Sequence, residues 1–414
     1  MKKVLCATFL LLTVLLQAQE NVFRQHISYL ASDSLHGRLA GSVDDSLTAV
    51  YLRQELTSFG YRPLANEGWQ SFNFKRSKTV SEFLQQSGEK TYSRNVVMML
   101  PAGKQPAEES IVIGAHFDHI GMGGKSSGSR KPDTSAVHYG ADDNASGVAM
   151  ALALSKKLAD QQAQLRRNIV VVMFGSEEQG IIGSKYFVEH PLEEAGKIVM
   201  MFNFDMVGRL DSNKLLQIHG TKTFVEAEQL LNHATLNHEE LQFQFFAGGY
   251  GPSDHTAFYA AKIPILYFTT GIHYDYHTPE DGIDKINFQG MSTILDFVAP
   301  IVLQIAKAEQ APTFQHAGDS RSARTPGKFK ITLGLIPDFN AVYEGPGMRA
   351  DFITEGKPAH KAGLKNGDVI LEMNGNEIKN IDDYMQQLGL IEAGSAINVK
   401  IKRGEEIMFF MVQV

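Results

Sequence analysis

The feature that most constrains the fold of this chain is a regular alternation of strand-like and helix-like segments between residues 111 and 307. The strand-like segments are short apolar runs at 111–116, 168–175, 197–205 and 263–271, and Ala- and Leu-rich segments of helical length, such as 146–160, lie between them. Uninterrupted apolar runs are typical of strands buried on both faces of a parallel sheet. The pattern predicts an α/β fold, a three-layer αβα architecture with a mainly parallel, mixed sheet between two layers of helices.

Titratable side chains follow the predicted strands where those strands end. They are His116, Asp118, Asp143, Glu177, Glu178, Asp205 and His277. In open α/β sheets ligands bind at the carboxyl ends of the strands, so these side chains are expected to meet at one edge. Imidazoles and carboxylates without thiolates suit zinc, with manganese or cobalt as possible substitutes.

The residue types favour two metal ions. A carboxylate can bridge two ions through its two oxygens, whereas an imidazole nitrogen has one lone pair, and Asp143 is the natural bridge because it is central among the candidates. Glu177 and Glu178 are consecutive and point in different directions, so one can bind metal while the other takes a proton from the attacking water. Asp118 lies two residues after His116 and is expected to orient that imidazole.

Five segments resemble the secreted co-catalytic di-zinc aminopeptidases, in the order of that family: GAHFDHIG, GADDNASG, GSEEQGIIGS, NFDMVGR and YHTPEDGID. The resemblance extends over about residues 20–307, and the wider relatives include glutamate carboxypeptidase, glutaminyl cyclase and the transferrin receptor. It implies two Zn²⁺ ions per chain, one held by His116, Asp143 and Asp205. The other is implied to be held by Asp143, Glu178 and His277.

The same resemblance implies roles for further residues. Glu177 would be the general base for a zinc-bridging water, Tyr276 would hydrogen-bond the reacting carbonyl, and the Asp143–Asn144 peptide bond would be cis. A substrate-pocket loop would contain Ser253, Asp254 and His255. The remaining polar residues of these motifs are expected in structural positions, with Asp142 as a loop cap, Arg209 in a salt bridge, and His119, His138 and His273 at the pocket rim or in solvent.

The C-terminal part of the chain has a different character. Residues 308–327 lose apolar periodicity and gain Pro, Gly, Ser and Arg, which predicts a linker between a peptidase domain over 20–307 and a domain over 328–414. The segments ITLGLIPDF and PAHKAGLKNGDVILEMNG resemble a PDZ domain, a small β-rich module. Such domains bind an extended peptide or a protein C-terminus at a sheet edge. The candidate peptide-binding loop is Leu333, Gly334, Leu335 and Ile336.

The N-terminus predicts export. Residues 1–19 have two lysines, an apolar stretch and a small residue before a cleavage site after Gln19, which is typical of a signal peptide. We therefore expect a periplasmic or extracellular protein without a retained transmembrane anchor. The single cysteine, Cys6, would be removed with this segment, which leaves no disulfide or thiol chemistry. The mature chain would have 37 basic and 46 acidic residues and no basic stripe, so nucleic acid is not an expected partner.

Together these features predict an exported zinc exopeptidase, an aminopeptidase acting on peptide substrates. Three alternatives remain open at this point. A glutaminyl cyclase-like acyltransferase would use one zinc, although the chain keeps both His116 and Asp205. A carboxypeptidase would differ in which substrate terminus the pocket neutralises, and a non-catalytic receptor or scaffold would be expected to lose ligands.

Overall fold

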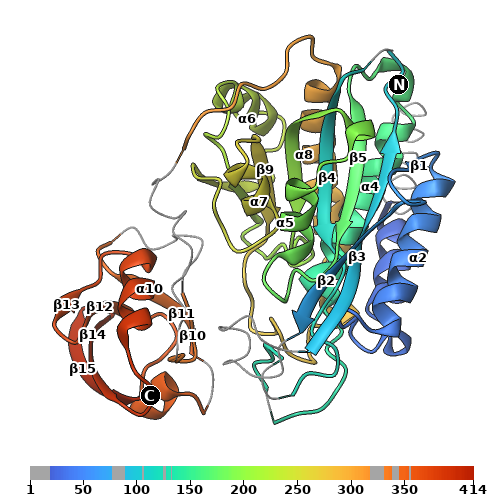
Figure 1. Cartoon of the computed structure of the whole chain (residues 1–414). Coiled ribbons are helices and arrows are strands. Elements are labelled where there is room, and N and C mark those ends of the chain that lie inside the picture. The colour runs from blue at the N-terminus through green and yellow to red at the C-terminus, as the bar shows by residue number, and fades with distance from the viewer. Residues whose placement is uncertain are drawn as a thin grey trace, which may run out of the picture. The chain divides into compact units, whose positions relative to one another are not determined.

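The computed structural model describes residues 19–76, 89–104, 107–124, 127–131, 133–317, 331–337, 345–353 and 356–414. These residues belong to two compact units (Figure 1). The larger unit contains most of the chain up to residue 317, and the smaller unit contains the described residues from 331 to 414. Residues 1–18 of the predicted signal peptide and residues 318–327 of the predicted linker lie outside the described part of the chain.

A nine-stranded mixed sheet forms the centre of the larger unit. Along the chain its strands are β1 (Arg62–Pro63), β2 (Trp69–Arg76), β3 (Glu89–Leu100), β4 (Glu109–His116), β5 (Asn168–Phe174), β6 (Lys197–Phe204), β7 (Leu215–His219), β8 (Gln242–Phe246) and β9 (Ile265–Thr269). Their order is β1-β3-β5-β4-β6-β9-β7-β8, with β2 paired to β3. The central run β5-β4-β6-β9 is parallel, while β3 and β7 join it antiparallel. The prediction of a mainly parallel, mixed sheet is confirmed.

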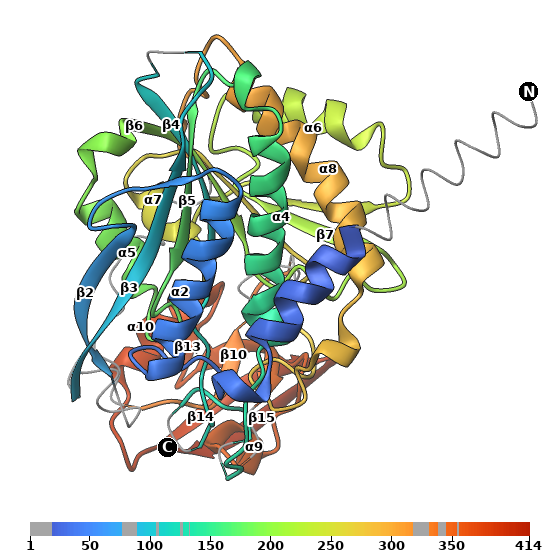
Figure 2. The ribbon, with the colours of Figure 1, turned by 90° about the vertical axis from the view of Figure 1, so that its right-hand side faces the viewer.

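Helices cover both faces of this sheet. Those of the larger unit are a helix over residues 19–30, α2 (Val43–Ser58), α4 (Gly147–Ala159), α5 (Ile182–Glu189), α6 (Ala227–Thr235), α7 (His255–Ala260) and α8 (Phe288–Lys307). Single turns lie at Asp33–Leu35, Gln162–Gln164, Glu193–Ala195 and Ile283–Lys285. Alternate residues of β4 point to opposite layers: Ile111 and Ile113 belong to the same apolar core as residues of α2, α4 and α8, and Val112 belongs to the core that includes residues of α5 and α7. Figure 2 shows the first of these layers.

Helix α8 is the one helix of the described residues that is long and apolar enough to cross a membrane. Of its most apolar window, 67% is buried inside the fold. Val298 and Val302 are fully buried and belong to the core on one side of the sheet. The apolar character of α8 is accounted for by this packing, since a core helix has the same composition as a membrane span.

The smaller unit is an antiparallel sheet with two helices, which confirms the predicted β-rich module. Its elements are β10 (Leu335–Pro337), β11 (Met348–Ile353), α9 (Pro358–Ala362), β12 (Val369–Met373), β13 (Asn376–Glu377), α10 (Ile381–Leu390), β14 (Ala396–Arg403) and β15 (Glu406–Gln413). The unit has its own apolar core, which includes Ile370, Val399 and Val412. Asp368 is buried at the start of β12 and accepts two hydrogen bonds from Arg403.

The first ten residues after α8 remain attached to the larger unit. The carbonyl of Thr313 accepts a hydrogen bond from the Val225 amide at 2.9 Å, and the Thr313 amide donates to the Glu226 carboxylate at 3.0 Å. Phe314 forms an isolated β-bridge with Phe224. Apolar periodicity could not reveal this attachment, because it depends on backbone hydrogen bonds to a distant segment.

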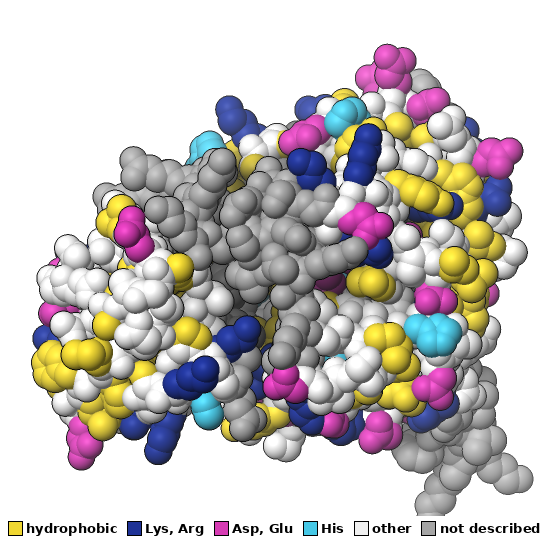
Figure 3. Space-filling view, turned by 60° about the horizontal axis from the view of Figure 1, so that its bottom comes forward, with side chains coloured by type: hydrophobic (Ala, Val, Ile, Leu, Met, Phe, Trp, Pro, Cys, Tyr) yellow, Lys and Arg dark blue, Asp and Glu magenta, His cyan; other side chains and the backbone are white. Residues whose placement is uncertain are grey.

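The surface carries charges of both signs. On the face drawn in Figure 3, Lys and Arg side chains are interspersed with Asp and Glu side chains. The acidic residues outnumber the basic ones over the whole chain, 46 to 39. Mixed charge of this kind on a protein surface favours solubility.

The sheet centre can be tested by opening a cavity in it. Phe202 lies fully buried on β6, so Phe202→Ala is expected to lower the free energy of unfolding by about 3–5 kcal/mol. Trp69, the only tryptophan, lies on β2 of the same sheet, so denaturation followed by its fluorescence reports on this unit. Leu236, 73% exposed, provides the control: Leu236→Ala should change the unfolding free energy by less than about 0.5 kcal/mol. Equal effects of the two substitutions would contradict this core assignment.

Candidate metal centre

The predicted metal ligands lie around the carboxyl ends of three central strands. His116 is the last residue of β4, Asp205 follows β6 directly, and Glu178 lies in the loop after β5. Because β4 pairs in parallel with both β5 and β6, these three strand ends lie at the same edge of the sheet. Two loops, one before α4 and one after β9, bring Asp143 and His277 to the same place.

Asp143 lies between two groups of ligand atoms. Its Oδ1 is 3.4 Å from His116 Nε2, which is also 3.4 Å from Asp205 Oδ1. Its Oδ2 is 3.1 Å from His277 Nε2, which is 3.0 Å from Glu178 Oε2. The two oxygens of one carboxylate therefore face different imidazoles, as a bridging ligand requires.

These spacings fit metal binding. Two ligand atoms in a tetrahedral zinc site, each about 2.0–2.1 Å from the ion, lie about 3.3 Å apart. The side chains of the five ligands are at most 12% exposed, from His116 at 1% to His277 at 12%. Carboxylates buried this deeply need cations to offset their lost hydration. One ion could be held by His116, Asp143 and Asp205, and a second by Asp143, Glu178 and His277.

The loop that carries Asp143 is held by side chains from distant segments. It forms one irregular helical turn, η2 (Ala141–Ser146), in which the Asp143–Asn144 peptide bond is cis, as the resemblance implied. The amides of Asp142 and Asp143 both donate to Asp281 Oδ2, at 2.9 and 3.0 Å. The Asn144 side chain donates to the carbonyl of Phe204, the residue before Asp205. This hydrogen bond ties the carboxyl end of β6 to the turn that carries Asp143.

Asp118 holds the turn that carries the two glutamates. Its carboxylate accepts hydrogen bonds from the amides of Glu177 at 2.9 Å and Glu178 at 3.4 Å. We predicted that this carboxylate orients His116, but it lies 4.0 Å from His116 Nδ1, whereas the Asp118 backbone carbonyl lies at 3.2 Å. The side chain therefore positions the general-base candidate more directly than the imidazole.

Glu177 is close to the ligands without belonging to either group of ligand atoms. Burial raises the pKa of Glu177 well above its usual range; His116 opposes this shift, and Asp254, Glu178 and Asp205 add to it. A carboxylate with a raised pKa is a stronger base than an ordinary glutamate. This position and chemistry suit proton transfer.

Two of the three histidines expected at the rim are buried. His119 is fully buried, and its Nδ1 donates to Glu178 Oε1 at 2.7 Å, which places this ring directly beside the second ligand group. His138 is also fully buried, with Nδ1 3.0 Å from the Ala136 carbonyl. The expectation of a rim or solvent position is wrong for both. For His119 the reason is its contact with Glu178, a residue from a distant segment. His273 has a 16% exposed side chain and contacts the buried Asp142 at 3.0 Å.

The remaining predicted residues surround this centre. Tyr276 stacks on His277 with ring centroids 3.9 Å apart. Ser253 accepts a hydrogen bond from Asn203 at 2.8 Å, Asp254 is fully buried, and the fully buried His255 stacks on Tyr267 at 4.4 Å. Burial raises the pKa of Asp254 to about 7. Arg209 makes the predicted structural salt bridges, at 3.1 Å to both Asp275 and Asp281.

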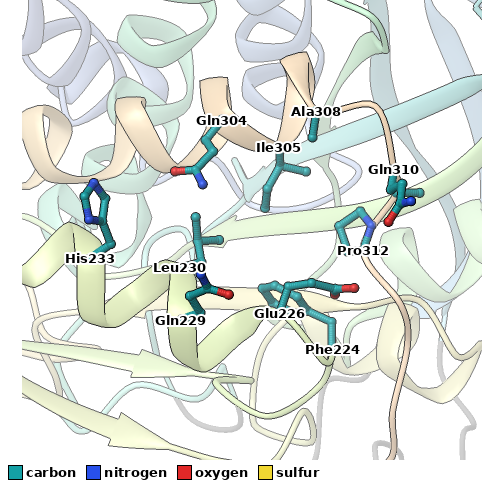
Figure 4. Close-up of a pocket in the computed structure, with 11 residues that line it drawn as sticks. Phe224, Glu226, Gln229, Leu230, His233, Gln304, Ile305, Ala308, Gln310 and Pro312 are labelled. Carbon is teal, nitrogen blue, oxygen red and sulfur yellow. The ribbon is translucent and has the colours of Figure 1, made fainter.

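Asp281 was not identified from the sequence, although it lies within YHTPEDGID. A carboxylate that binds backbone amides of another loop has no spacing of its own by which it could be recognised. The structure also has a pocket of about 530 Å³ between α6, α8 and residues 308–312 (Figure 4). The residues that line it include Leu230, His233 and Ile305 and none of the metal-site residues.

Comparison with known proteins agrees with this geometry. The sequence profile of peptidase family M28 matches residues 95–302, which is half of the 414-residue chain, and a PDZ domain profile matches residues 341–414. Aminopeptidase YwaD of Bacillus subtilis is 29% identical over 181 residues, 42% of this chain but 39% of that protein. Uncharacterized protein YfbL of Escherichia coli is 25% identical over 338 residues, 73% of this chain and 99% of that protein.

Solved structures show the same fold at low identity. The zinc aminopeptidase BSAP of Bacillus subtilis superposes with a TM-score of 0.55 at 16% identity, covering 70% of this chain and 95% of that chain. Glutaminyl cyclase of Porphyromonas gingivalis superposes with a TM-score of 0.53 at 19% identity, covering 68% and 97%. On the profile match, the strand-end ligands and this fold, the chain belongs to peptidase family M28, a family of metallopeptidases, and carries a C-terminal PDZ domain.

Proposed function

We propose that this protein is a zinc aminopeptidase that hydrolyses peptides with two Zn²⁺ ions per chain. The observation that carries the proposal is the pair of buried ligand groups that share Asp143, with Glu177 beside them. Manganese or cobalt could replace zinc, since all the ligands are imidazoles and carboxylates.

Bound zinc ions would act as Lewis acids toward the scissile carbonyl and would lower the pKa of a water molecule. Glu177 accepts a proton from the attacking water and returns it to the leaving amine, so that the C–N bond breaks without an unstable amide anion. Asp118 holds the backbone of Glu177 in position for this transfer. Tyr276, stacked on His277, donates a hydrogen bond to the reacting carbonyl oxygen.

Aminopeptidase action is favoured over cyclisation. A sequence relative and a solved structure of similar fold are named aminopeptidases. Another solved structure of similar fold is a glutaminyl cyclase. A cyclase is expected to use one zinc. This chain has complete ligand groups on both sides of Asp143, including His116 and Asp205, which supports the two-ion hydrolase.

The proposal extends to the ends of the chain. The signal-like residues 1–19 support export to the periplasm or the extracellular space. The PDZ domain would bind an extended peptide or a protein C-terminus. The candidate loop begins with Leu333, which is buried, and Gly334, which has a φ of 72° and an amide held by the Thr332 hydroxyl. It continues into β10 with Leu335 and Ile336.

Replacing the proposed base should separate chemistry from metal binding. Glu177→Gln is expected to retain both zinc ions and to lower kcat by about 10²–10⁴-fold, because the amide cannot take the proton of water. Steady-state kinetics and metal analysis of the same preparation measure the two quantities. Glu194, exposed on a one-turn helix, supplies the control, and Glu194→Gln should leave both unchanged. Turnover of Glu177→Gln within a few-fold of wild type would remove Glu177 from this role.

Metal content tests the two ligand groups. Wild-type protein should hold about two zinc ions per chain, since each carboxylate–imidazole group completes one site. His277→Ala should retain about one, while His233→Ala, which alters an exposed histidine on α6, should retain two. Removal of zinc by a chelator should abolish turnover, and added zinc should restore it. A wild-type content of one zinc would instead favour the cyclase.

Substrate termini distinguish the candidate reactions. An aminopeptidase should shorten peptides with free N-termini one residue at a time and leave N-acetylated peptides intact, because its pocket must bind the free amine. Mass spectrometry of a mixed panel reads the products directly. Loss of C-terminal residues would indicate a carboxypeptidase, and loss of ammonia from an N-terminal glutamine peptide would indicate a cyclase. No product from zinc-loaded protein would favour a non-catalytic receptor.

A further inference from the structure

The segment ASDSLHGRLAGS, residues 31–42, has no part in the chemistry above, yet it lies directly against the metal centre. The carbonyl of Arg38 accepts a hydrogen bond from the His119 amide at 3.1 Å, and the carbonyl of Gly37 accepts one from the Gly121 amide at 3.0 Å. Leu39 pairs with His119 in an isolated parallel bridge. This segment therefore continues the backbone pairing beyond the end of β4.

Three consecutive residues of this segment, His36–Arg38, have a left-handed backbone, with φ values of 40°, 73° and 49°. At Gly37 a side chain cannot be accommodated, because a Cβ would lie 2.5 Å from the carbonyl oxygens of both Gly121 and His138. The close approach and the unusual backbone direct the Arg38 side chain into the protein, where the residue is only 1% exposed.

The Arg38 guanidinium binds four backbone carbonyls. It donates to Phe117 at 2.9 Å, to Tyr139 at 2.8 Å, to Gly140 at 3.0 Å and to Leu30. A planar fork with five N–H donors can make such a set of bonds, whereas the ammonium of lysine has three donors on one atom.

Three of these carbonyl groups belong to the two segments that carry metal ligands. Phe117 lies between His116 and Asp118, at the end of β4. Tyr139 and Gly140 lead into the turn of Asp143, the proposed bridging ligand. One side chain thus joins the backbone of the β4 end to that of the loop before α4.

The charge of Arg38 also lies near the carboxylates of the site. Burial lowers the pKa of Arg38 to about 10, opposed by Asp143, Asp118, Asp281 and Glu178, so the guanidinium remains charged at neutral pH. A buried cation costs free energy unless it is paired and fully hydrogen-bonded. Attraction between Arg38 and the metal ions cannot account for the burial of the guanidinium, because zinc is itself a cation. The contacts to carbonyls are the more direct explanation.

We propose that Arg38 is a positioning residue of the metal centre, which fixes the segment of His116 and Asp118 relative to the loop of Asp143 so that the ligand groups are preformed for metal. The inference rests on the proposed function for the identity of the ions as zinc. It predicts that Arg38 affects metal retention and ligand geometry, beyond any effect on the stability of the fold.

The chain contains a matched control for this idea. Arg167 is 2% exposed, and its guanidinium donates to the carbonyls of Ile305 and Ala308 at 2.8 and 2.7 Å and to the Glu109 carboxylate at 2.9 Å. It directly precedes β5, so it lies at the end of the sheet opposite the metal ligands. A substitution there removes a comparable buried guanidinium without touching the ligand segments.

The experiment compares full-length Arg38→Lys and Arg167→Lys with wild type. Both substitutions should lower the thermal midpoint, but only Arg38→Lys should speed the loss of zinc to excess chelator, by about tenfold or more. Cobalt-substituted Arg38→Lys should also show an altered visible absorption spectrum, because that spectrum reports ligand geometry. Wild-type zinc retention and an unchanged spectrum in Arg38→Lys, or equal effects in both variants, would overturn the proposal. Wild-type protein that binds no zinc would refute the proposed function instead.

A second measurement needs no variant and applies even if Arg38→Lys does not fold. Coupling is reciprocal, so if Arg38 favours metal binding, bound zinc must stabilise the contacts of Arg38. Hydrogen exchange of wild-type protein should then show slower exchange of the amides at 36–41 with zinc than without it, although these residues provide no proposed ligand. Exchange near Arg167 should be unchanged. Equal exchange at 36–41 in both states would overturn the inference.

Discussion

The structure depends on one carboxylate that faces two imidazoles. Asp143 directs one oxygen to His116 and the other to His277, at 3.4 and 3.1 Å. This arrangement needs a strand end and two loops to meet within a few ångströms. Parallel pairing of β4 with β5 and β6 provides the common edge, since parallel strands end on the same side of a sheet. The neighbouring side chains of the site hold Asp143 at this edge of the sheet.

Three kinds of support hold that position. Asp281 accepts hydrogen bonds from the amides at the start of the Asp143 turn, and Asn144 binds the last carbonyl of β6. Arg38 binds the carbonyls of Tyr139 and Gly140, which directly precede that turn. Each uses a side chain to bind the backbone of a different segment. Such contacts are directional, and in a buried site a lost partner costs about 1–3 kcal/mol because the remaining group is unsatisfied. The ligands are therefore held by hydrogen bonds that lie mostly outside the ligand set.

The candidate ligands and the alternation of strands and helices were accessible from the sequence because each has a local signal. Apolar runs identify strands, and His116, Asp143, Glu178 and Asp205 follow them at positions that the motifs make visible. His119 was misplaced, although it lies within the same GAHFDHIG motif. Its burial follows from hydrogen bonds to Arg38 and Glu178, which are about 80 and 60 residues away in the chain, and no local pattern reports such contacts.

By itself, the sequence determined the αβα architecture, the PDZ module and the residue types that gather at the strand ends, because periodicity and motif order are properties of neighbouring residues. Only the tertiary structure decided which oxygen of Asp143 faces which imidazole, that the Asp118 carboxylate holds the two glutamates, and that Arg38 joins the segments of the site. These are contacts between residues far apart in the chain. The distances between the contacting atoms depend on how the layers pack and how the strands pair. The packing and the pairing are properties of the folded chain.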